Sequence, residues 1–597
     1  MRRSKLRDRG HARIGLIVGC GALAAGILLI ASSITRAQEN GGPVVTVTGG
    51  QIQGRLLPGP GGAVFKGIPY AAPPTANFRW REPQPVKAWE SMLQAAEYGA
   101  DCPAVPGGIE YRAAFGGTLN QGNPPAPAAA PDSGRSRTPK SEDCLFLNVW
   151  TPQWPSTSKK AVMVWFHGGE LAGGTGRLRS GPAEQAESSL ARNGVVVVSV
   201  NFRGHLLGMM GHPELTAESP HHASGNYLLL DQIAALKWVH DNIGRFGGDP
   251  ANVTIFGQSG GGRSVSMLVA SPLSKGLVQR AIIESGSPME STRPYLTKGE
   301  LEKIGLALGQ TLKAPSGGEI PYLRSLPASE IAAALGEVRR RLDEQNLLAF
   351  DEGIDGYVTP DSPAMIFRSH KELPIPLMVG NTAHDSGTVN GGMPWHPGSS
   401  PEEGKAWVKA MLQVFYAKYP DLLDQALKAY GFNGAPTEVV TYPPYGTLPQ
   451  QVGTDLNHRC GVKATALWHS ALAPTYQFEF SRATPEHPAV HIAELPFVFG
   501  YLSDEDLKDP NALKLRHQVQ AYWTNFAKTG DPNGPGLPVW SKYDGATKPS
   551  MEFVNDGAVA RTAARAAACA PYIEKFTREP DLMVGGEHAQ LRGGNVR

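Results

Sequence analysis

The sequence is poor in cysteine, and the cysteines that it has are far apart. Only five occur among 597 residues, and none has the short spacing of a zinc site or a redox pair. The adjacent residues His221 and His222 look like a metal-binding pair, but no acidic or cysteine partner accompanies them. We therefore expect these histidines to be solvated loop residues, and we predict neither a metal site nor a cofactor.

No basic stripe interleaved with aromatic residues is present, which argues against nucleic acid as a partner. The formal charge of +2 is unevenly distributed, because residues 1–37 contain seven Lys or Arg and one Asp. Without the six net positive charges of this segment, the remaining chain has a formal charge of −4. The apparent basicity therefore belongs to the N-terminal segment.

Only one apolar run, residues 14–31, is long enough to span a membrane. It follows a basic start and precedes the small-residue end Thr35-Arg36-Ala37, as in a secretory signal. We predict that residues 1–37 are a signal peptide and that the protein is periplasmic or secreted, with an uncleaved membrane anchor as the alternative. Cys20 lies inside the run and is interpreted as apolar filler. At the other end, residues 581–597 are expected to form a flexible tail.

Four cysteines remain after cleavage, and an even number in an exported chain favours two disulfides. The sequence alone allows three pairings of Cys102, Cys144, Cys460 and Cys569. The proline- and alanine-rich residues 122–140 are predicted to form a surface loop rather than a linker between domains.

Strand and helix patterns alternate through the middle of the chain, which predicts an α/β fold with a mostly parallel sheet covered on both faces. The unbroken apolar run at residues 195–200 is typical of a central parallel strand. Apolar residues recur at helical spacing between residues 226 and 246, and Gly247-Gly248-Asp249-Pro250 is expected to end that helix and turn the chain back. Other strands are expected at residues 161–166, 253–256 and 280–283.

A serine lies between glycines where one expected strand ends. Residues 253–256 run directly into Gly257-Gln258-Ser259-Gly260-Gly261, and a helical pattern follows at residues 264–270. In a Gly-x-Ser-x-Gly turn the glycines permit close backbone approach and the serine adopts a strained conformation. The helix that follows points amide dipoles at a developing oxyanion. We interpret Ser259 as a nucleophile, with a flexible glycine-rich turn as the alternative.

The tripeptide His167-Gly168-Gly169 follows the strand expected at residues 161–166. In serine hydrolases of this architecture, backbone amides in such a loop complete the oxyanion hole. A plain tight turn is the other interpretation of this tripeptide.

Three long motifs in the right order resemble the type-B carboxylesterase family, which includes bacterial esterases, animal carboxylesterases and cholinesterases. They are SEDCLFLNVW (141–150), NYLLLDQIAALKWVHDNIGRFGGDPANVTIFGQSGGG (226–262) and HIAELPFVFG (491–500). The likeness extends from about Pro43 to Phe576. It implies one α/β-hydrolase domain, predicted over residues 38–580, with a large mostly parallel sheet flanked by helices. Length alone would have suggested several domains.

The resemblance implies that Ser259 is the nucleophile, His491 the general base and Asp385 the acid that orients it. The acid is the irregular member, because the family usually has Glu followed directly by Gly, whereas here Asp is followed by Ser386. The shorter carboxylate must come about one methylene closer to His491. His384 is a competing titratable group, yet two histidines without an acid would not hold a tautomer.

The resemblance also implies that the amides of Gly169, Glu170 and Gly260 form the oxyanion hole. Glu170 stands where the family usually has Gly or Ala. Only its N–H is needed if its side chain turns away, whereas a carboxylate facing the oxyanion would oppose catalysis electrostatically.

Gln258 precedes the nucleophile, where cholinesterases have Glu, and no tryptophan lies near Gly134, where those enzymes hold a quaternary ammonium. Both differences argue against a choline ester substrate. Ser285 and Glu494 match family positions in a buried polar network with the histidine, and a purely structural role is the alternative. The same matching pairs the cysteines as Cys102 with Cys144 and Cys460 with Cys569.

The sequence therefore predicts an exported serine carboxylesterase that hydrolyses small-molecule esters through an acyl-enzyme intermediate. One alternative is a catalytically silent binding or adhesion protein of the same fold, because some members of the family have lost the nucleophile. Another is a hydrolase of amide, thioester or carbamate bonds. Membrane association is expected only if the N-terminal segment is uncleaved.

Overall fold

The computed structural model describes residues 41–58, 61–103, 139–169, 176–178, 189–290, 295–344, 352–385, 400–434, 445–484 and 489–579. The predicted signal peptide, the predicted C-terminal tail and most of the 122–140 loop lie outside the described residues. Within the ranges just given, no helix combines the length and the apolar character that crossing a membrane requires.

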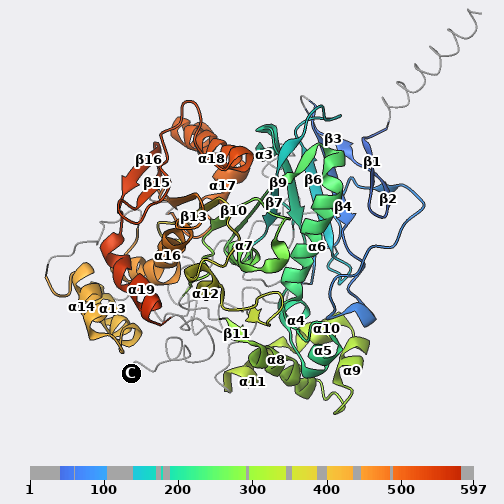
Figure 1. Ribbon diagram of the computed structural model, residues 1–597, viewed down its shortest axis with the longest axis horizontal. Helices are drawn as coiled ribbons and strands as arrows, with labels where there is room; N and C mark the ends of the chain where they lie inside the picture. Colours follow the sequence, from blue (N-terminus) through green and yellow to red (C-terminus); the bar gives the residue numbers. More distant parts are fainter. Residues whose placement is uncertain are drawn as a thin grey trace, which may run out of the picture.

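A mixed sheet of eleven strands runs through the protein (Figure 1). Its order is β16 (Gly557–Thr562), β15 (Pro549–Val554), β14 (Thr475–Phe480), β13 (Leu377–Thr382), β10 (Arg280–Glu284), β9 (Gly248–Gln258), β7 (Lys160–Phe166), β8 (Val196–Val200), β6 (Phe146–Thr151), β4 (Ala63–Pro69) and β3 (Arg55–Leu56). Neighbours from β15 to β8 are parallel, and the antiparallel pairs lie toward the two edges. The mostly parallel α/β sheet predicted from the sequence is confirmed.

Both faces of the sheet are buried, and strand β7 shows why its sequence reads as a continuous apolar run. Val164 and Phe166 belong to one hydrophobic core, whereas Met163 and Trp165 belong to the other. Successive strand residues point to opposite faces, so a strand between two cores needs an apolar residue at every position. Helices α6 (Tyr227–Asn242) and α7 (Gly260–Ala270) pack into the first core, and α18 (Pro510–Thr529) packs into the second.

The helix expected before the serine strand is present, but the turn after it is shorter than predicted. Helix α6 continues as a 3₁₀ turn over Ile243–Phe246, and Gly247 ends it with φ of 81°. The prediction that Gly248-Asp249-Pro250 also belongs to the turn is wrong, because β9 already begins at Gly248. There Gly248 lies opposite Lys160 of β7. This pairing joins residues distant in the sequence, so no local signal could reveal it.

Two long insertions follow the carboxyl ends of β10 and β13, the edge of the sheet where ligands bind in α/β folds. Their helices occupy the lower and left parts of Figure 1. After β10 come α8 (Lys298–Thr311), α9 (Glu319–Ser325), α10 (Ala328–Ala333), α11 (Leu335–Glu344) and α12 (Pro363–Arg368); after β13 come α13 (Pro401–Phe415), α14 (Pro420–Ala429), α15 (Leu448–Thr454), the π-helical segment η5 (Asp455–Arg459) and α16 (Cys460–His469). The last helix of the described chain, α19 (Ala566–Arg578), follows β16.

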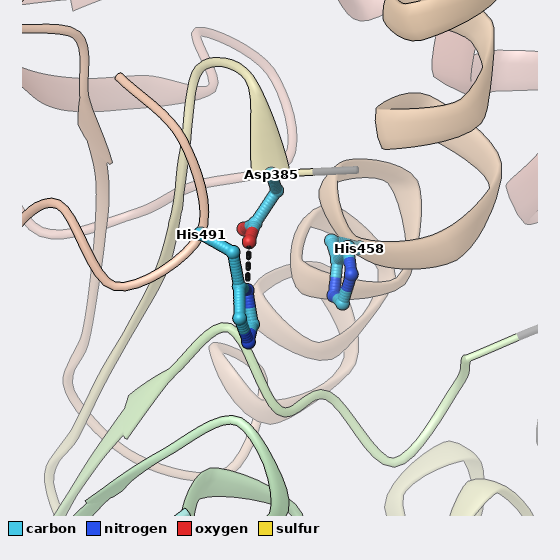
Figure 2. A group of neighbouring side chains, drawn as sticks. All are labelled: Asp385, His458 and His491. Atoms are coloured by element: carbon cyan, nitrogen blue, oxygen red, sulfur yellow. Dashed lines mark hydrogen bonds and ion pairs between the residues drawn. The ribbon is translucent and has the colours of Figure 1, made fainter. Parts of the chain in front are cut away.

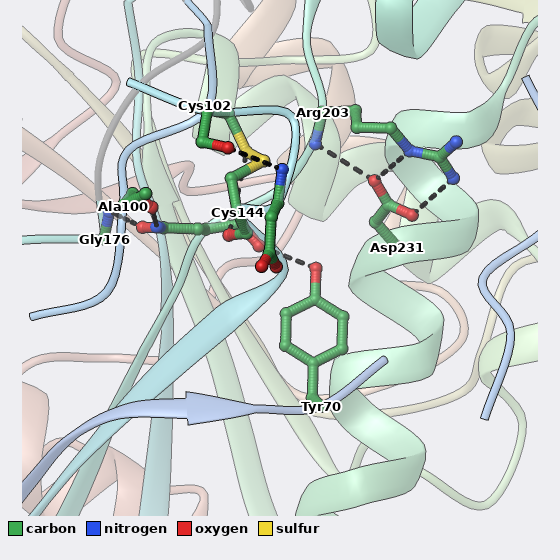
Figure 3. Close-up of a disulfide and its surroundings, with 10 residues drawn as sticks. Tyr70, Ala100, Cys102, Cys144, Gly176, Arg203 and Asp231 are labelled. Atoms are coloured by element: carbon green, nitrogen blue, oxygen red, sulfur yellow. Dashed lines mark hydrogen bonds and ion pairs between the residues drawn. A yellow bond between two sulfur atoms is a disulfide. The ribbon is translucent and has the colours of Figure 1, made fainter. Parts of the chain in front are cut away.

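Two disulfides are present, and they are the pairs that the resemblance implies. Cys102 is bonded to Cys144 across a separation of 42 residues, in surroundings shown in Figure 3. Cys460 at the start of α16 is bonded to Cys569 in α19 across a separation of 109 residues. All four cysteines are buried, so the bonds are part of the packed interior.

Replacing Cys460 and Cys569 together by serine is expected to lower the free energy of unfolding by about 4–5 kcal/mol. The loss arises because the unfolded chain regains the entropy of a long open loop. Replacing Cys102 and Cys144 is expected to cost about 4 kcal/mol, since that loop is shorter. Urea unfolding followed by tryptophan fluorescence, without reductant, measures both variants. An unchanged unfolding midpoint in the Cys460 and Cys569 variant would contradict the expectation.

Candidate active site

Ser259 occupies the turn between the last residue of β9 and the first residue of α7. Its backbone angles are φ 58° and ψ −125°, a left-handed conformation that costs a non-glycine residue about 1–3 kcal/mol. The turn is held in part by the Ser259 N–H, which donates to the carbonyl of Glu284 at 2.9 Å. The surrounding structure therefore imposes a strained position on this serine at the carboxyl edge of the sheet.

The glycines around Ser259 are required by close backbone approach. A Cβ atom added at Gly261 would lie 2.0 Å from the carbonyl oxygen of Phe166, and one added at Gly257 would lie 2.8 Å from the same oxygen. Real Cβ atoms do not approach that closely, so any larger residue would push the turn away from the end of β7. The Gly-x-Ser-x-Gly pattern thus has the steric cause expected from the sequence.

The tripeptide after β7 lies against this turn. A Cβ atom at Gly168 would be 3.2 Å from the Cβ of Ser259, and Gly169 has φ of 106°. Gly260 is the first residue of α7, so its amide belongs to the unpaired N-terminal set of that helix. Glu170, the third expected amide donor, lies outside the described residues.

The structure brings Asp385 and His491 together. Asp385 follows β13 and is fully buried, and its Oδ1 accepts a hydrogen bond from Nδ1 of His491 (Figure 2). The two segments are joined at the backbone, where the N–H of His384 donates to the carbonyl of Ala489 at 2.9 Å. Asp385 therefore reaches the imidazole although its side chain is shorter than the family's usual Glu.

Other groups fix the orientation and the charge of Asp385. Its Oδ2 accepts from the Ser285 hydroxyl at 2.7 Å and from the Thr382 N–H at 3.0 Å. Burial alone would raise the pKa of this carboxyl, but the nearby His458 and His491 and the hydrogen bonds hold it well below its usual range. In turn, burial would lower the pKa of His491, and Asp385 raises it above the ordinary value. The pair is therefore an ionised carboxylate with a basic imidazole.

His384, the competing titratable group, contacts another part of the chain. A Cβ atom at Gly446 would lie 2.8 Å from its Nε2, and burial lowers the pKa of its ring. No hydrogen bond joins the His384 and His491 side chains among the residues that the structure describes. The carboxylate, not this histidine, is the partner of His491.

The second nitrogen of His491 faces Gln258. Its Nε2 is 3.2 Å from Nε2 of Gln258. Because Nδ1–H is donated to Asp385, Nε2 of the neutral ring is an acceptor, and the Gln258 amide is the donor in this contact. Ser259 and His491 are both described, and no hydrogen bond joins their side chains in this arrangement. The imidazole must therefore exchange the Gln258 amide for another donor before it can accept a proton from Ser259.

Glu284 and Glu494 are two further buried carboxyl groups near the site. The Trp523 indole N–H donates to Oε1 of Glu284 at 2.8 Å, and burial raises the pKa of Glu284 to about 8. Burial and the charges of Glu284 and Asp385 raise the pKa of Glu494 well above its usual value. Among the described residues no hydrogen bond joins Glu494 to His491. Burial therefore favours the protonated form of both carboxyl groups, whereas the pKa of Asp385, next to the imidazole, is lowered.

Sequence reasoning missed His458, which lies beside the Asp385–His491 hydrogen bond (Figure 2). The ring centroids of His458 and His491 are 5.5 Å apart, and Nδ1 of His458 is 4.0 Å from Oε1 of Glu290. His458 belongs to the π-helical segment η5, whose extra residue per turn shifts the side chains out of α-helical register. In the sequence, His458 is marked only as a titratable residue two positions before Cys460, and this does not indicate a position in the site.

Comparison with known proteins identifies, over nearly the whole chain, the family that the sequence motifs resemble. Residues 41–570 match the model of the Carboxylesterase family. The chain is 31% identical to para-nitrobenzyl esterase of Bacillus subtilis, covering 85% of this chain and 94% of that protein. It is 30% identical to fumonisin B1 esterase of Sphingopyxis macrogoltabida, covering 89% and 91%, and 33% identical to liver carboxylesterase 1 of Oryctolagus cuniculus, covering 87% and 92%.

Solved structures agree with the sequence relatives. A para-nitrobenzyl (PNB) esterase structure superposes with a TM-score of 0.66 at 29% identity, covering 90% of this chain and 99% of that one. A thermophilic PNB esterase gives a TM-score of 0.67 at 28% identity, with the same two coverages. The chain therefore belongs to the type-B carboxylesterase family of α/β-hydrolases and is a carboxylic ester hydrolase.

Proposed function

We propose that the protein is a serine esterase in which Ser259 is the nucleophile, His491 the general base and Asp385 the acid that orients it. The observation that carries the proposal is the hydrogen bond from His491 to the ionised Asp385, next to the strained Ser259 turn. This bond fixes the tautomer with its lone pair on Nε2, the atom needed to accept a proton.

The reaction begins when Nε2 of His491 exchanges the Gln258 amide for the Ser259 hydroxyl. His491 takes the hydroxyl proton as Ser259 attacks the ester carbonyl, and Asp385 stabilises the imidazolium. His491 then protonates the leaving alkoxide, so the alcohol departs and an acyl-serine ester remains. Water attacks this ester with His491 again as base, which releases the carboxylic acid and restores Ser259.

The backbone N–H groups of Gly169, Glu170 and Gly260 are assigned the role of stabilising the negative charge that develops on the carbonyl oxygen. The position of Gly260 at the first turn of α7 supports its part, because helix N-terminal amides are unpaired and carry the positive end of the dipole. Losing one such donor typically costs about 2.7–4 kcal/mol in the transition state. In this proposal only the backbone N–H of Glu170 is used.

Ser285 and Glu494 are assigned supporting roles, and Ser285 gives the sharper test. Replacing Ser285 by alanine removes a hydrogen bond to the Asp385 carboxylate worth about 1.5 kcal/mol, so kcat should fall about tenfold with little change in KM. Ser287→Ala is the matched control, because that hydroxyl contacts Thr465 instead. Steady-state kinetics on one ester checks both variants. An unchanged kcat in Ser285→Ala would show that the Thr382 N–H and His491 are enough to hold the carboxylate.

The proposed activity is tested with p-nitrophenyl acyl esters and an organophosphonate. We expect hydrolysis with a preference for some acyl lengths, and one phosphonate mass adduct on the peptide that contains Ser259. Matched p-nitroanilide, thioester and carbamate substrates should give lower kcat/KM values than the ester. A folded protein that neither hydrolyses the ester nor takes up the label would instead be the silent binding or adhesion protein.

The proposed location is the periplasm or the medium, after removal of residues 1–37. Two buried disulfides are compatible with an oxidising compartment. Mass spectrometry of the N-terminus of the protein expressed in a bacterial host should then begin at Gln38. An intact N-terminus on protein that sediments with membranes would indicate an anchor instead.

A further inference from the structure

Three metal-ligating side chains from separate segments meet beside the proposed catalytic residues. Asp385 follows β13, His458 lies in η5 and His491 lies in the segment after β14. One ligand atom from each lies within 4.8 Å of the other two, and Figure 2 shows the three groups side by side. Two of the three have proposed catalytic roles, whereas nothing in the mechanism uses His458.

Carboxyl groups, which are metal-ligating or metal-supporting groups, lie in and beside this cluster. Asp385 is fully buried, and Glu290 provides a second buried carboxyl group, whose Oε2 lies 4.0 Å from Nη1 of Arg263. Oε1 of Glu290 is 4.0 Å from Nδ1 of His458, slightly beyond hydrogen-bond distance. A metal-binding histidine usually donates the N–H of its other ring nitrogen to a group such as a carboxylate, which orients the ring. A small shift of Glu290 would therefore orient Nε2 of His458 toward a metal.

The donor set selects the kind of cation. Calcium and magnesium take oxygen ligands, whereas two imidazoles and one carboxylate suit Zn²⁺, Co²⁺ and similar divalent transition metals. Three protein ligands leave a fourth position of tetrahedral zinc for water. The His458 and His491 side chains retain 14% and 10% exposure, which gives a path from solvent.

We propose that Asp385, His458 and His491 form an inhibitory site for Zn²⁺ that switches the esterase off. The metal takes Oδ1 of Asp385 and Nδ1 of His491, so it replaces their mutual hydrogen bond. A neutral imidazole bound to metal through Nδ1 carries its proton on Nε2, and the displaced Nδ1 proton is thus accounted for. Nε2 then has no lone pair for the Ser259 proton. The cation is a regulator and not a cofactor.

The inhibition rests on the proposed function, but metal binding does not, and the test measures both. Chelator-treated enzyme is titrated with ZnCl₂ while hydrolysis of a p-nitrophenyl ester is followed, and EDTA is then added. We expect inhibition that EDTA reverses. Separately, Ser259→Ala is titrated with Co²⁺ and its visible absorption recorded. Bands typical of four- or five-coordinate cobalt with nitrogen ligands are expected, and zinc should abolish them.

His458→Phe keeps a buried ring and removes one of the three ligands. The rate of this variant in the presence of zinc is compared with the rate of the same variant without metal. The zinc concentration that inhibits it should be more than about tenfold higher than for the wild type. Glu290→Gln should raise the inhibitory zinc concentration about 10- to 100-fold. The double variant His221→Ala with His222→Ala is the matched control. It removes two exposed, consecutive histidines that are not part of the proposed site, so zinc inhibition should be unchanged.

Equal zinc inhibition in His458→Phe and wild type would overturn the proposal, as would an active wild type that zinc does not inhibit. If His458→Phe does not fold, the cobalt spectrum of Ser259→Ala decides, and an absence of nitrogen-ligand bands overturns the proposal. Cobalt bands in a protein that hydrolyses no ester would refute the proposed function while the metal site stands.

Discussion

Replacing Ser259 by alanine is expected to lower kcat for ester hydrolysis by about 10⁶-fold, the largest effect of any substitution considered for this chain. In the proposed mechanism the Ser259 hydroxyl oxygen forms the bond to the carbonyl carbon, and alanine has no atom that can form it. Substrate binding should persist, because alanine removes a single oxygen and leaves the proposed oxyanion amides in position. Organophosphonate labelling should be lost together with turnover.

A matched control for Ser259→Ala lies one turn later on the same helix. The Ser264 hydroxyl is fully buried and has no hydrogen-bond partner among the described residues, so Ser264→Ala should keep kcat within about threefold. Active-site titration with the phosphonate corrects both rates for the amount of folded enzyme. A Ser259→Ala protein that retains more than about 1% of wild-type kcat would place the nucleophile elsewhere.

The fold could be predicted where the sequence signal is local or repeated. Apolar periodicity located α6, and Gly247 marked its end because only a left-handed residue fits there. The unbroken apolar run located β8, since a strand with two buried faces needs no polar side. The true start of β9 could not be predicted, because Gly248 is held in the strand by Lys160 from a distant segment.

The candidate site was predictable through its motifs and not through its contacts. The glycines around Ser259 have a steric cause that the pattern itself expresses. The meeting of Asp385 with His491 required the family resemblance, because more than a hundred residues separate them. The Gln258 contact with Nε2 and the position of His458 depend on rotamers and on a π-helical segment. No sequence periodicity reports either feature.

Replacing Asp385 by asparagine is expected to lower kcat by about 10⁴-fold with the fold intact. Asparagine has nearly the same shape, but its amide can present an N–H to Nδ1 of His491. The imidazole then accepts at Nδ1 and carries its proton on Nε2, so it cannot take the Ser259 proton. KM should change little, because Asp385 is buried and does not touch substrate.

Asp385→Glu separates the charge of this residue from its length. It keeps an anion for the imidazolium and has the side chain usual in the family, but it must fit a space where Ser285 and Thr382 already hold the shorter carboxylate. We expect a loss well below that of Asp385→Asn, about 10- to 100-fold, from misplacement of the carboxylate. Steady-state kinetics and melting temperatures compare the two variants. If both lose activity equally, the position acts through packing; if asparagine retains wild-type kcat, a different group orients His491.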